Sequence, residues 1–156
     1  MPDPLLTARS VVYPWHCDHM GHMNVMWYVG KFDEATWHLF TMLGLTPAFL
    51  RSHDRGMAAV QQEITYRHEL HAGDVITIYS RVLEVKEKAI RFSHEMWNEE
   101  TGEVAAITSI MGVHINTQLR KSCPLPPAVI ERAQEICRRA RQKKDKPCFS
   151  GCSLHR

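Results

Sequence analysis

A single long helical pattern at residues 24–44 lies between stretches that alternate like strands, and it restricts the possible folds more than any other feature. Mostly apolar residues recur there at three- and four-residue steps, as one face of a helix requires; they are Met26, Val29, Phe32, Thr36, Leu39 or Phe40, and Leu43. Asn24 is a suitable N-cap and Gly44 a suitable stop. A helix of this length has about five turns, so its apolar face needs a large partner surface.

Most of the remaining chain has the composition and the alternation of β-strands. Strands are predicted at residues 10–15, 57–67, 75–85, 90–96 and 103–116, with turns at 73–74, 86–88 and 98–102. Residues 16–24 are predicted to form a loop and residues 45–56 a connection. Pro127 is suited to the start of a second helix, whose apolar residues are Val129, Ile130, Ala133, Ile136, Cys137 and Ala140.

This order of elements predicts one domain of the α+β class. One long helix with a run of antiparallel strands is expected to give a sheet that curls round the helix. The length of 156 residues suits a single domain. The domain is predicted to cover residues 10–141, after an N-terminal arm at 1–9. Residues 142–156 are polar and lysine-rich without periodicity, and are predicted to be a disordered tail.

Composition and charge exclude several classes of function. The formal net charge is +2 and the basic residues do not gather in one block, which argues against a nucleic-acid partner. No run approaches the roughly 20 apolar residues that span a bilayer, and residues 1–7 do not resemble a signal peptide, so no membrane partner is expected. Five cysteines, an odd number, fit free thiols in a reducing compartment, so a cytoplasmic location is expected.

The residues that carry chemistry lie in one segment, HCDHMGHMNVMWY at residues 16–28. Hydrolysis of an acyl compound needs a carboxylate that attacks the carbonyl or activates water. It also needs donors for the oxyanion, which the free amides at a helix N-terminus can supply. Asp18 lies in the loop before the long helix, and Gly21 allows that loop to turn back. We therefore expect the carboxylate and the first helix amides, around Val25, to face one point.

The pattern Asp18-x-x-Gly21-His22-x-Asn24-x-x-x-Tyr28 resembles the signature of hotdog-fold acyl-CoA thioesterases, the 4-hydroxybenzoyl-CoA thioesterase-like group. Further stretches between residues 11 and 130 resemble the same family; they are Phe32-Asp33-Glu34-Ala35, Glu69-Leu70-x-Ala72-Gly73-Asp74, Thr101-Gly102-Glu103, and Arg120-Lys121 before Pro124-Leu125-Pro126. The resemblance implies a hotdog fold, in which a curved antiparallel sheet wraps a long central helix. It also implies a homodimer or homotetramer with the active site at the dimer interface, and no cofactor or metal.

Position by position, the resemblance implies a role for individual residues in the hydrolysis of acyl-CoA. Asp18 would be the nucleophile or general base, and the backbone N–H of Val25 would polarise the thioester carbonyl. His22 and Asn24 would position water, substrate or the carboxylate. The remaining expected substrate contacts are Tyr28 near the acyl group, Asp33 and Glu34 on the central helix, and the basic residues Lys86, Lys88, Arg120 and Lys121, which would hold the nucleotide end of CoA.

Plainer interpretations of the same residues stay open. Asp18 alone could form a turn, Asn24 could serve only as an N-cap, and His22 could be a structural histidine. The basic residues could be ordinary solvated turn residues. The imidazoles, thiol and carboxylate of residues 16–22 are zinc-ligand types, but their spacing fits no standard zinc motif. His16 stands where many relatives have a second aspartate, which leaves its role open.

Two other functions are alternatives to acyl-CoA hydrolysis. An acyl-carrier-protein thioesterase would present a basic docking surface to an acidic protein instead of a nucleotide site. A non-catalytic hotdog domain would bind acyl-CoA without turnover, and would have no need of the carboxylate loop. A hydratase of the same fold is disfavoured, because the Asp/His pairing of such enzymes is not visible in this sequence.

Overall fold

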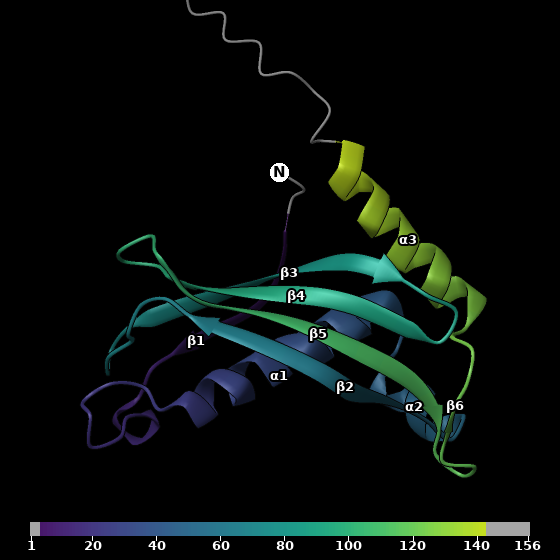
Figure 1. Ribbon diagram of the computed structural model, residues 1–156, viewed down its shortest axis with the longest axis horizontal. Coiled ribbons are helices and arrows are strands. Elements are labelled where there is room, and N and C mark those ends of the chain that lie inside the picture. Colours follow the sequence, from purple (N-terminus) through teal and green to yellow (C-terminus); the bar gives the residue numbers. More distant parts are fainter. Residues whose placement is uncertain (1–3, 143–156) are drawn as a thin grey trace, which may run out of the picture.

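A long helix, α1, lies under a curved sheet of antiparallel strands (Figure 1). The computed structural model describes the backbone of residues 4–142 and the side chains of residues 4–139. In chain order the elements are β1 (Leu5–Val11), the short 3-10 helix η1 (Pro14–His16), α1 (Val25–Leu43), α2 (Pro47–Ser52), β2 (Arg55–Tyr66), β3 (Val75–Val85), β4 (Ala89–Asn98), β5 (Val104–Asn116), β6 (Lys121–Ser122) and α3 (Pro127–Gln142). The α+β hotdog arrangement predicted from the sequence is confirmed.

The strands form one antiparallel sheet in the order β1-β3-β4-β5-β2, and β6 pairs with the end of β5. α1 lies along the concave face, and α3 packs beside β3 (Figure 1). β2 pairs only with β5 in the described part of the chain, so its other edge carries unpaired backbone groups. An open edge of this length is a surface on which another strand can add.

The ends of α1 follow from local chemistry. Asn24 has extended backbone, and its side-chain oxygen accepts the N–H of Met26 at 3.0 Å, which satisfies one of the free amides of the first turn. Gly44 has a φ of 97°, a left-handed conformation that side chains disfavour, and it ends the helix. Both predicted ends are confirmed.

The core lies between α1 and the sheet. The alternation predicted for β4 is confirmed, because Ile90, Phe92, His94 and Met96 are buried and point toward α1 or the neighbouring core. His94 is a polar member of this core. Its ring stacks on Phe32, with centroids 5.9 Å apart, and its two nitrogens lie 2.9 Å from Thr36 Oγ1 and 2.5 Å from Ser80 Oγ.

The protons of the His94 network can be assigned from its partners. Thr36 Oγ1 donates its only proton to the carbonyl of Phe32 at 3.0 Å, so it accepts from Nε2–H of His94. Burial lowers the pKa of His94 to about 3, so its ring is neutral at neutral pH. The Nδ1 atom of the neutral ring accepts from the hydroxyl of Ser80, whose oxygen lies 2.6 Å from Thr7 Oγ1. The network links β1, β3, β4 and α1.

Several sequence predictions about element positions are wrong. The first strand occupies Leu5–Val11 and not residues 10–15, where Pro14 begins η1; residues 5–9 therefore belong to the sheet and not to an N-terminal arm. The connection at 45–56 contains α2, which begins at Pro47 behind its cap Thr46, and β6 was missed. The predicted tail, 142–156, lies outside the described residues except for its first.

The buried face of α1 also differs from the predicted one near its N-terminus. Met26 is 63% exposed and Val29 is 41% exposed, although both were assigned to the apolar face. Tyr28 and Lys31 are buried instead. Lys31 reaches β1, where its Nζ donates to Ser10 Oγ at 2.6 Å, so a polar partner allows a lysine to occupy this position.

In the part of the chain that the structure describes, no helix combines the length and the apolar character that a membrane crossing requires.

Candidate active site

The loop between η1 and α1 is closed by backbone hydrogen bonds at its two ends. Cys17 and Met23 form an isolated antiparallel bridge, and the N–H of Asn24 donates to the carbonyl of His16 at 2.8 Å. The N–H of Met23 donates to the carbonyl of Leu70 at 2.7 Å, which fastens the loop to the segment before β3. The loop is therefore a rigid support for the side chains between its ends.

Asp18 lies inside this loop with its carboxylate held by two donors. Its Oδ1 accepts the N–H of Met20 at 2.8 Å, and its Oδ2 accepts from the side-chain amide of Asn24 at 2.7 Å. Its carbonyl accepts the N–H of Gly21 at 3.0 Å, in a turn that the glycine allows with a φ of 83°. The hydrogen bond from Asn24, then that from Met20, lowers the pKa of Asp18, because both donors stabilise the ionised form.

Asn24 connects the carboxylate to the helix. The oxygen of its side chain accepts the N–H of Met26, and the nitrogen of the same amide donates to Asp18. One side chain therefore caps α1 and orients the acid. This places Asp18 at the N-terminal end of the helix dipole, as the sequence predicts.

The amide of Val25 is the first N–H of α1. It has no acceptor among the described residues, while the amides of Met26 and Trp27 both donate to Asn24. An N–H at this position is oriented along the helix axis and carries part of its positive dipole. It can therefore donate to an oxygen atom of a bound molecule.

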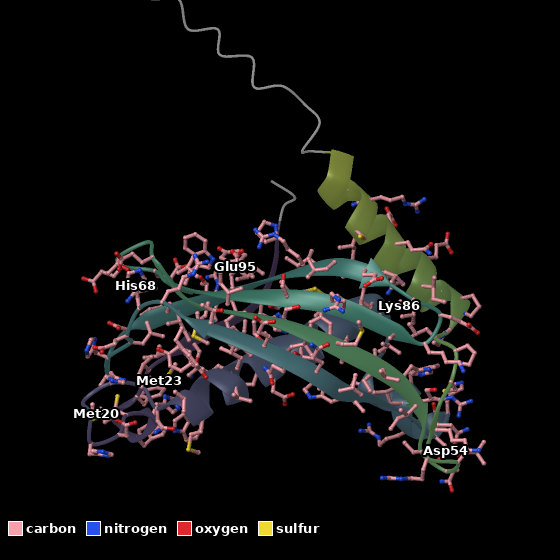
Figure 2. The ribbon with its side chains drawn as sticks, in the orientation of Figure 1. Met20, Met23, Asp54, His68, Lys86 and Glu95 are labelled. Carbon is pink, nitrogen blue, oxygen red and sulfur yellow. The ribbon has the colours of Figure 1, made fainter. Side chains whose placement is uncertain are left out.

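A cavity of about 250 Å³ opens beside this amide. Its lining comes from the loop, from α1, and from the end of β2 with the segment that follows; the residues are His22, Met23, Val25, Tyr28, Tyr66, Arg67, His68 and Glu69. Figure 2 labels Met23 and His68, which lie on the same end of the molecule. Three predicted site residues, His22, Val25 and Tyr28, therefore share one cavity.

His22 and Tyr28 each have contacts that fix their place in this cavity. His22 Nε2 lies 3.7 Å from Glu69 Oε1, and its Nδ1 lies 3.3 Å from the carbonyl of Met23. The hydroxyl of Tyr28 donates to the carbonyl of His68 at 3.4 Å. Burial raises the pKa of Tyr28 to about 12, so the phenol is neutral.

His16 is a buried part of the loop support. Its Nδ1 accepts the N–H of Tyr13 at 2.9 Å, and its ring packs on Trp27 with centroids 4.6 Å apart. Burial and then the charge of Lys31 lower the pKa of His16, against the opposite effect of Glu34.

Two predicted substrate contacts on α1 lie apart from the carboxylate. Asp33 is exposed and lines a second, smaller cavity, about 80 Å³, between α1 and the strands β2 and β5. Glu34 is exposed and close enough to His16 to influence its pKa. Neither residue joins Asp18 at the N-terminus of the helix.

The predicted nucleotide-binding residues lie at the far end of the same subunit. Lys86 is labelled in Figure 2 at the β3–β4 turn, opposite to the end that holds Met20 and Met23. Lys88 is in the same turn, and Arg120 and Lys121 lie between β5 and β6 and in β6. The two basic segments are joined, because the N–H of His114 in β5 donates to the carbonyl of Lys88 at 2.8 Å. The two basic segments thus lie at the same end of the sheet (Figure 1), and one subunit does not bring them to Asp18.

The far wall of the cavity was not predicted from the sequence. Tyr66, Arg67, His68 and Glu69 follow one another at the end of β2, about 40 residues after the carboxylate loop. A run of aromatic and ionisable residues where a strand passes into a loop is a signal for a binding surface. From the sequence, Tyr66 and Arg67 are predicted only as the end of a strand, and Glu69 only as the start of a family-like turn.

No group of three or more His, Cys, Asp or Glu side chains is arranged as metal ligands among the described residues. The Nδ1 atom of His16 already accepts the N–H of Tyr13.

A family model described as the thioesterase-like superfamily matches residues 12–133. The L-carnitine dehydrogenase/betainyl-CoA thioesterase of Agrobacterium fabrum is 27% identical to this chain over 133 residues, which are 85% of this chain but 27% of that protein. The betainyl-CoA thioesterase of Pseudomonas aeruginosa is 21% identical over 136 residues, which are 87% of this chain and 86% of that protein. This chain therefore spans about a quarter of the first relative and most of the second.

Solved structures agree on the fold. A hypothetical protein of Staphylococcus aureus, crystallised in complex with CoA, superposes with a TM-score of 0.80 at 20% identity, covering 96% of this chain and 90% of that one. A 1,4-dihydroxy-2-naphthoyl-CoA thioesterase from Synechocystis superposes with a TM-score of 0.71 at 20% identity, covering 85% of this chain and 94% of that one. The chain belongs to the thioesterase-like superfamily and has its hotdog fold.

Proposed function

We propose that this protein hydrolyses an acyl-CoA thioester to a free carboxylic acid and CoA, with Asp18 as the reacting carboxylate. The observation that carries the proposal is the double use of Asn24, which caps α1 and holds Asp18 Oδ2 at 2.7 Å. Asp18 is thereby held at the end of α1 at which the N–H of Val25 has no acceptor among the described residues. Family membership supports thioester chemistry at this site.

The proposed reaction needs no group beyond those at the loop and a water molecule. Asp18 takes a proton from water as the oxygen of that water bonds to the thioester carbon, or Asp18 itself attacks and gives a mixed anhydride that water then cleaves. In either case the carbonyl oxygen gains negative charge, and the N–H of Val25 and the helix dipole stabilise it. The carbon–sulfur bond then breaks, and CoA leaves as a thiolate.

The hydrogen bonds of Asp18 suit a group that reacts in its ionised form. Each carboxylate oxygen accepts one N–H and retains a second lone pair. The lowered pKa keeps the carboxylate charged across the neutral range. A thioester suits such a weak base, because its thiolate leaves without a strong acid to protonate it.

We also propose that the working unit is a homodimer or a pair of dimers with the site at the dimer interface. β2 offers an open edge, on which Val60 is 63% exposed. The exposed residues Met26 and Val29 of α1 add apolar surface. A partner subunit could then supply to each site the basic residues that lie far from Asp18 in one chain, which are Lys86, Lys88, Arg120 and Lys121.

The experiment that tests this function is a thiol-release assay with a panel of acyl-CoAs of different chain length, aromaticity and charge. Betainyl-CoA, which gives two of the relatives their name, belongs in the panel. We expect turnover of at least one acyl-CoA, and no change in rate when a chelator is added. Faster turnover of the same acyl group on acyl carrier protein would favour the first alternative, and tight binding of acyl-CoAs without thiol release would favour the non-catalytic one.

A further inference from the structure

Two tyrosine rings meet at a right angle in the cavity beside Val25. The ring centroids of Tyr28 and Tyr66 are 5.1 Å apart and the ring planes are 85° apart. Tyr28 is buried and held by its hydrogen bond to the carbonyl of His68, whereas Tyr66 is 47% exposed at the end of β2. The two rings therefore line the cavity from α1 and from the end of β2, with Tyr28 as the buried ring and Tyr66 as the accessible one.

A carboxylate on the same cavity has no permanent cation beside it. The basic atoms near Glu69 are the imidazole nitrogens of His22, at 3.7 Å, and of His71, at 3.8 Å. No lysine or arginine of the described chain lies within ion-pair distance of Glu69. The cavity thus combines aromatic side chains with a carboxylate whose basic neighbours within ion-pair distance, among the described residues, are imidazoles.

We propose, on the basis of the function proposed above, that this cavity takes a compact acyl group that carries a quaternary ammonium. Such a cation is attracted to the faces of tyrosine rings within about 6 Å, and it needs no hydrogen-bond acceptor. Glu69 adds a long-range attraction, and Met23 provides an apolar floor for the methyl groups. The volume of about 250 Å³ is below the roughly 300–1,000 Å³ of pockets for drug-sized ligands, so the acyl group is short.

Arg67 lines the same cavity with the opposite charge. Its guanidinium repels a cationic acyl group. Removing the charge of Glu69 should therefore weaken the preference for a cationic acyl group, whereas removing the charge of Arg67 should not. Substitution of Arg67 is thus the internal control for substitution of Glu69.

The test compares trimethylammonioacetyl-CoA with 3,3-dimethylbutanoyl-CoA, in which carbon replaces nitrogen without a change of shape. The quantity measured is the ratio of kcat/KM for the charged ester to that for the neutral ester, in the wild type and in variants. Because the two esters differ in intrinsic reactivity, only the change of this ratio between proteins is interpreted. Tyr66 and Glu69 are exposed, so their substitution leaves the core intact, and circular dichroism confirms folding.

We expect Tyr66→Leu to lower the ratio about tenfold, the size of a desolvated cation–π contact, and Tyr66→Phe, which keeps the ring, to retain it. Glu69→Gln lowers the ratio as well, whereas Arg67→Gln does not lower it. An unchanged ratio in both Tyr66→Leu and Glu69→Gln would overturn the cationic subsite. Hydrolysis of other acyl-CoAs but not of the charged ester would overturn it too and leave the proposed function intact, whereas no hydrolysis of any acyl-CoA contradicts the proposed function itself.

Discussion

The side-chain amide of Asn24 donates to the carboxylate of Asp18 at 2.7 Å, while its oxygen accepts the N–H of Met26 at 3.0 Å. These two hydrogen bonds can be removed separately. Asn24→Asp keeps an acceptor for the helix cap, but it removes the donor to Asp18 and adds a second negative charge. Asn24→Ala removes both.

We expect Asn24→Asp to lower kcat at least tenfold with little change in thermal stability at pH 7, because aspartate caps helices as well as asparagine does. Its charge raises the pKa of Asp18, so the acid limb of the pH–rate profile moves to higher pH. Asn24→Ala should lower kcat and also destabilise the protein by about 1 kcal/mol. If Asn24→Asp and Asn24→Ala had the same stability and the same activity as each other, the double role of Asn24 would be contradicted.

We expect His16 to stabilise the loop by accepting a hydrogen bond and not by carrying a charge. Its Nδ1 accepts the N–H of Tyr13 at 2.9 Å, and a protonated ring would lose this hydrogen bond. Glutamine at the same position can accept a backbone N–H at every pH. We therefore expect His16→Gln to retain most of the activity and His16→Leu to lose at least tenfold in kcat. Similar activities in the two variants, measured with the same acyl-CoA from pH 5 to 8, would show that the hydrogen bond is dispensable.

His94 should make the folded state sensitive to acid. Its pKa is about 3 in the folded protein, against 6.5 for an imidazole in water, so below pH 6.5 the unfolded chain binds more protons than the folded one. This contribution to stability is full above pH 6.5 and is lost as the pH falls toward 3, at about 1.4 kcal/mol per pH unit. His94→Gln can donate to Thr36 and accept from Ser80 without titrating. Urea unfolding between pH 6.5 and 5 should show a smaller pH dependence in this variant, and an unchanged slope would contradict a buried neutral imidazole.

The open edge of β2 should be part of the subunit interface. Val60 is 63% exposed there, so Val60→Lys should not destabilise an isolated subunit. If Val60 is buried between subunits, the new charge should strongly destabilise their association. We expect this variant to dissociate in sedimentation velocity and to lose activity, while Val75→Lys, at an exposed position at the start of β3, serves as the matched control. A Val60→Lys protein that stays oligomeric would place the interface elsewhere.

Features encoded within a few residues could be predicted from the sequence. The cap at Asn24, the stop at Gly44 and the alternation in β4 depend on neighbours along the chain. The burial of Lys31 could not be predicted, because it depends on a partner, Ser10, that lies 21 residues away on another element. The short helix α2 was missed because a single turn and a half has little periodicity.

The same distinction applies to the site. Asp18, Asn24 and Val25 are near neighbours in sequence, and the loop that joins them has the expected course. Tyr66 reaches Tyr28 only because the end of β2 lies beside the start of α1, which no local pattern contains. The distance between Lys86 and Asp18 within one subunit likewise depends on the direction of the strands.

The role of Asp18 is tested most directly by the turnover of Asp18→Asn. Asparagine has the same shape and its oxygen can still accept one of the two N–H groups, so the loop should keep its conformation, but it can neither attack the thioester nor take a proton from water. With the acyl-CoA that the wild type hydrolyses fastest, we expect kcat to fall at least about 100-fold, with only a small loss of thermal stability from the missing hydrogen bond and retained binding of CoA. Turnover at the wild-type rate in this variant would contradict the assignment of Asp18 as the reacting carboxylate.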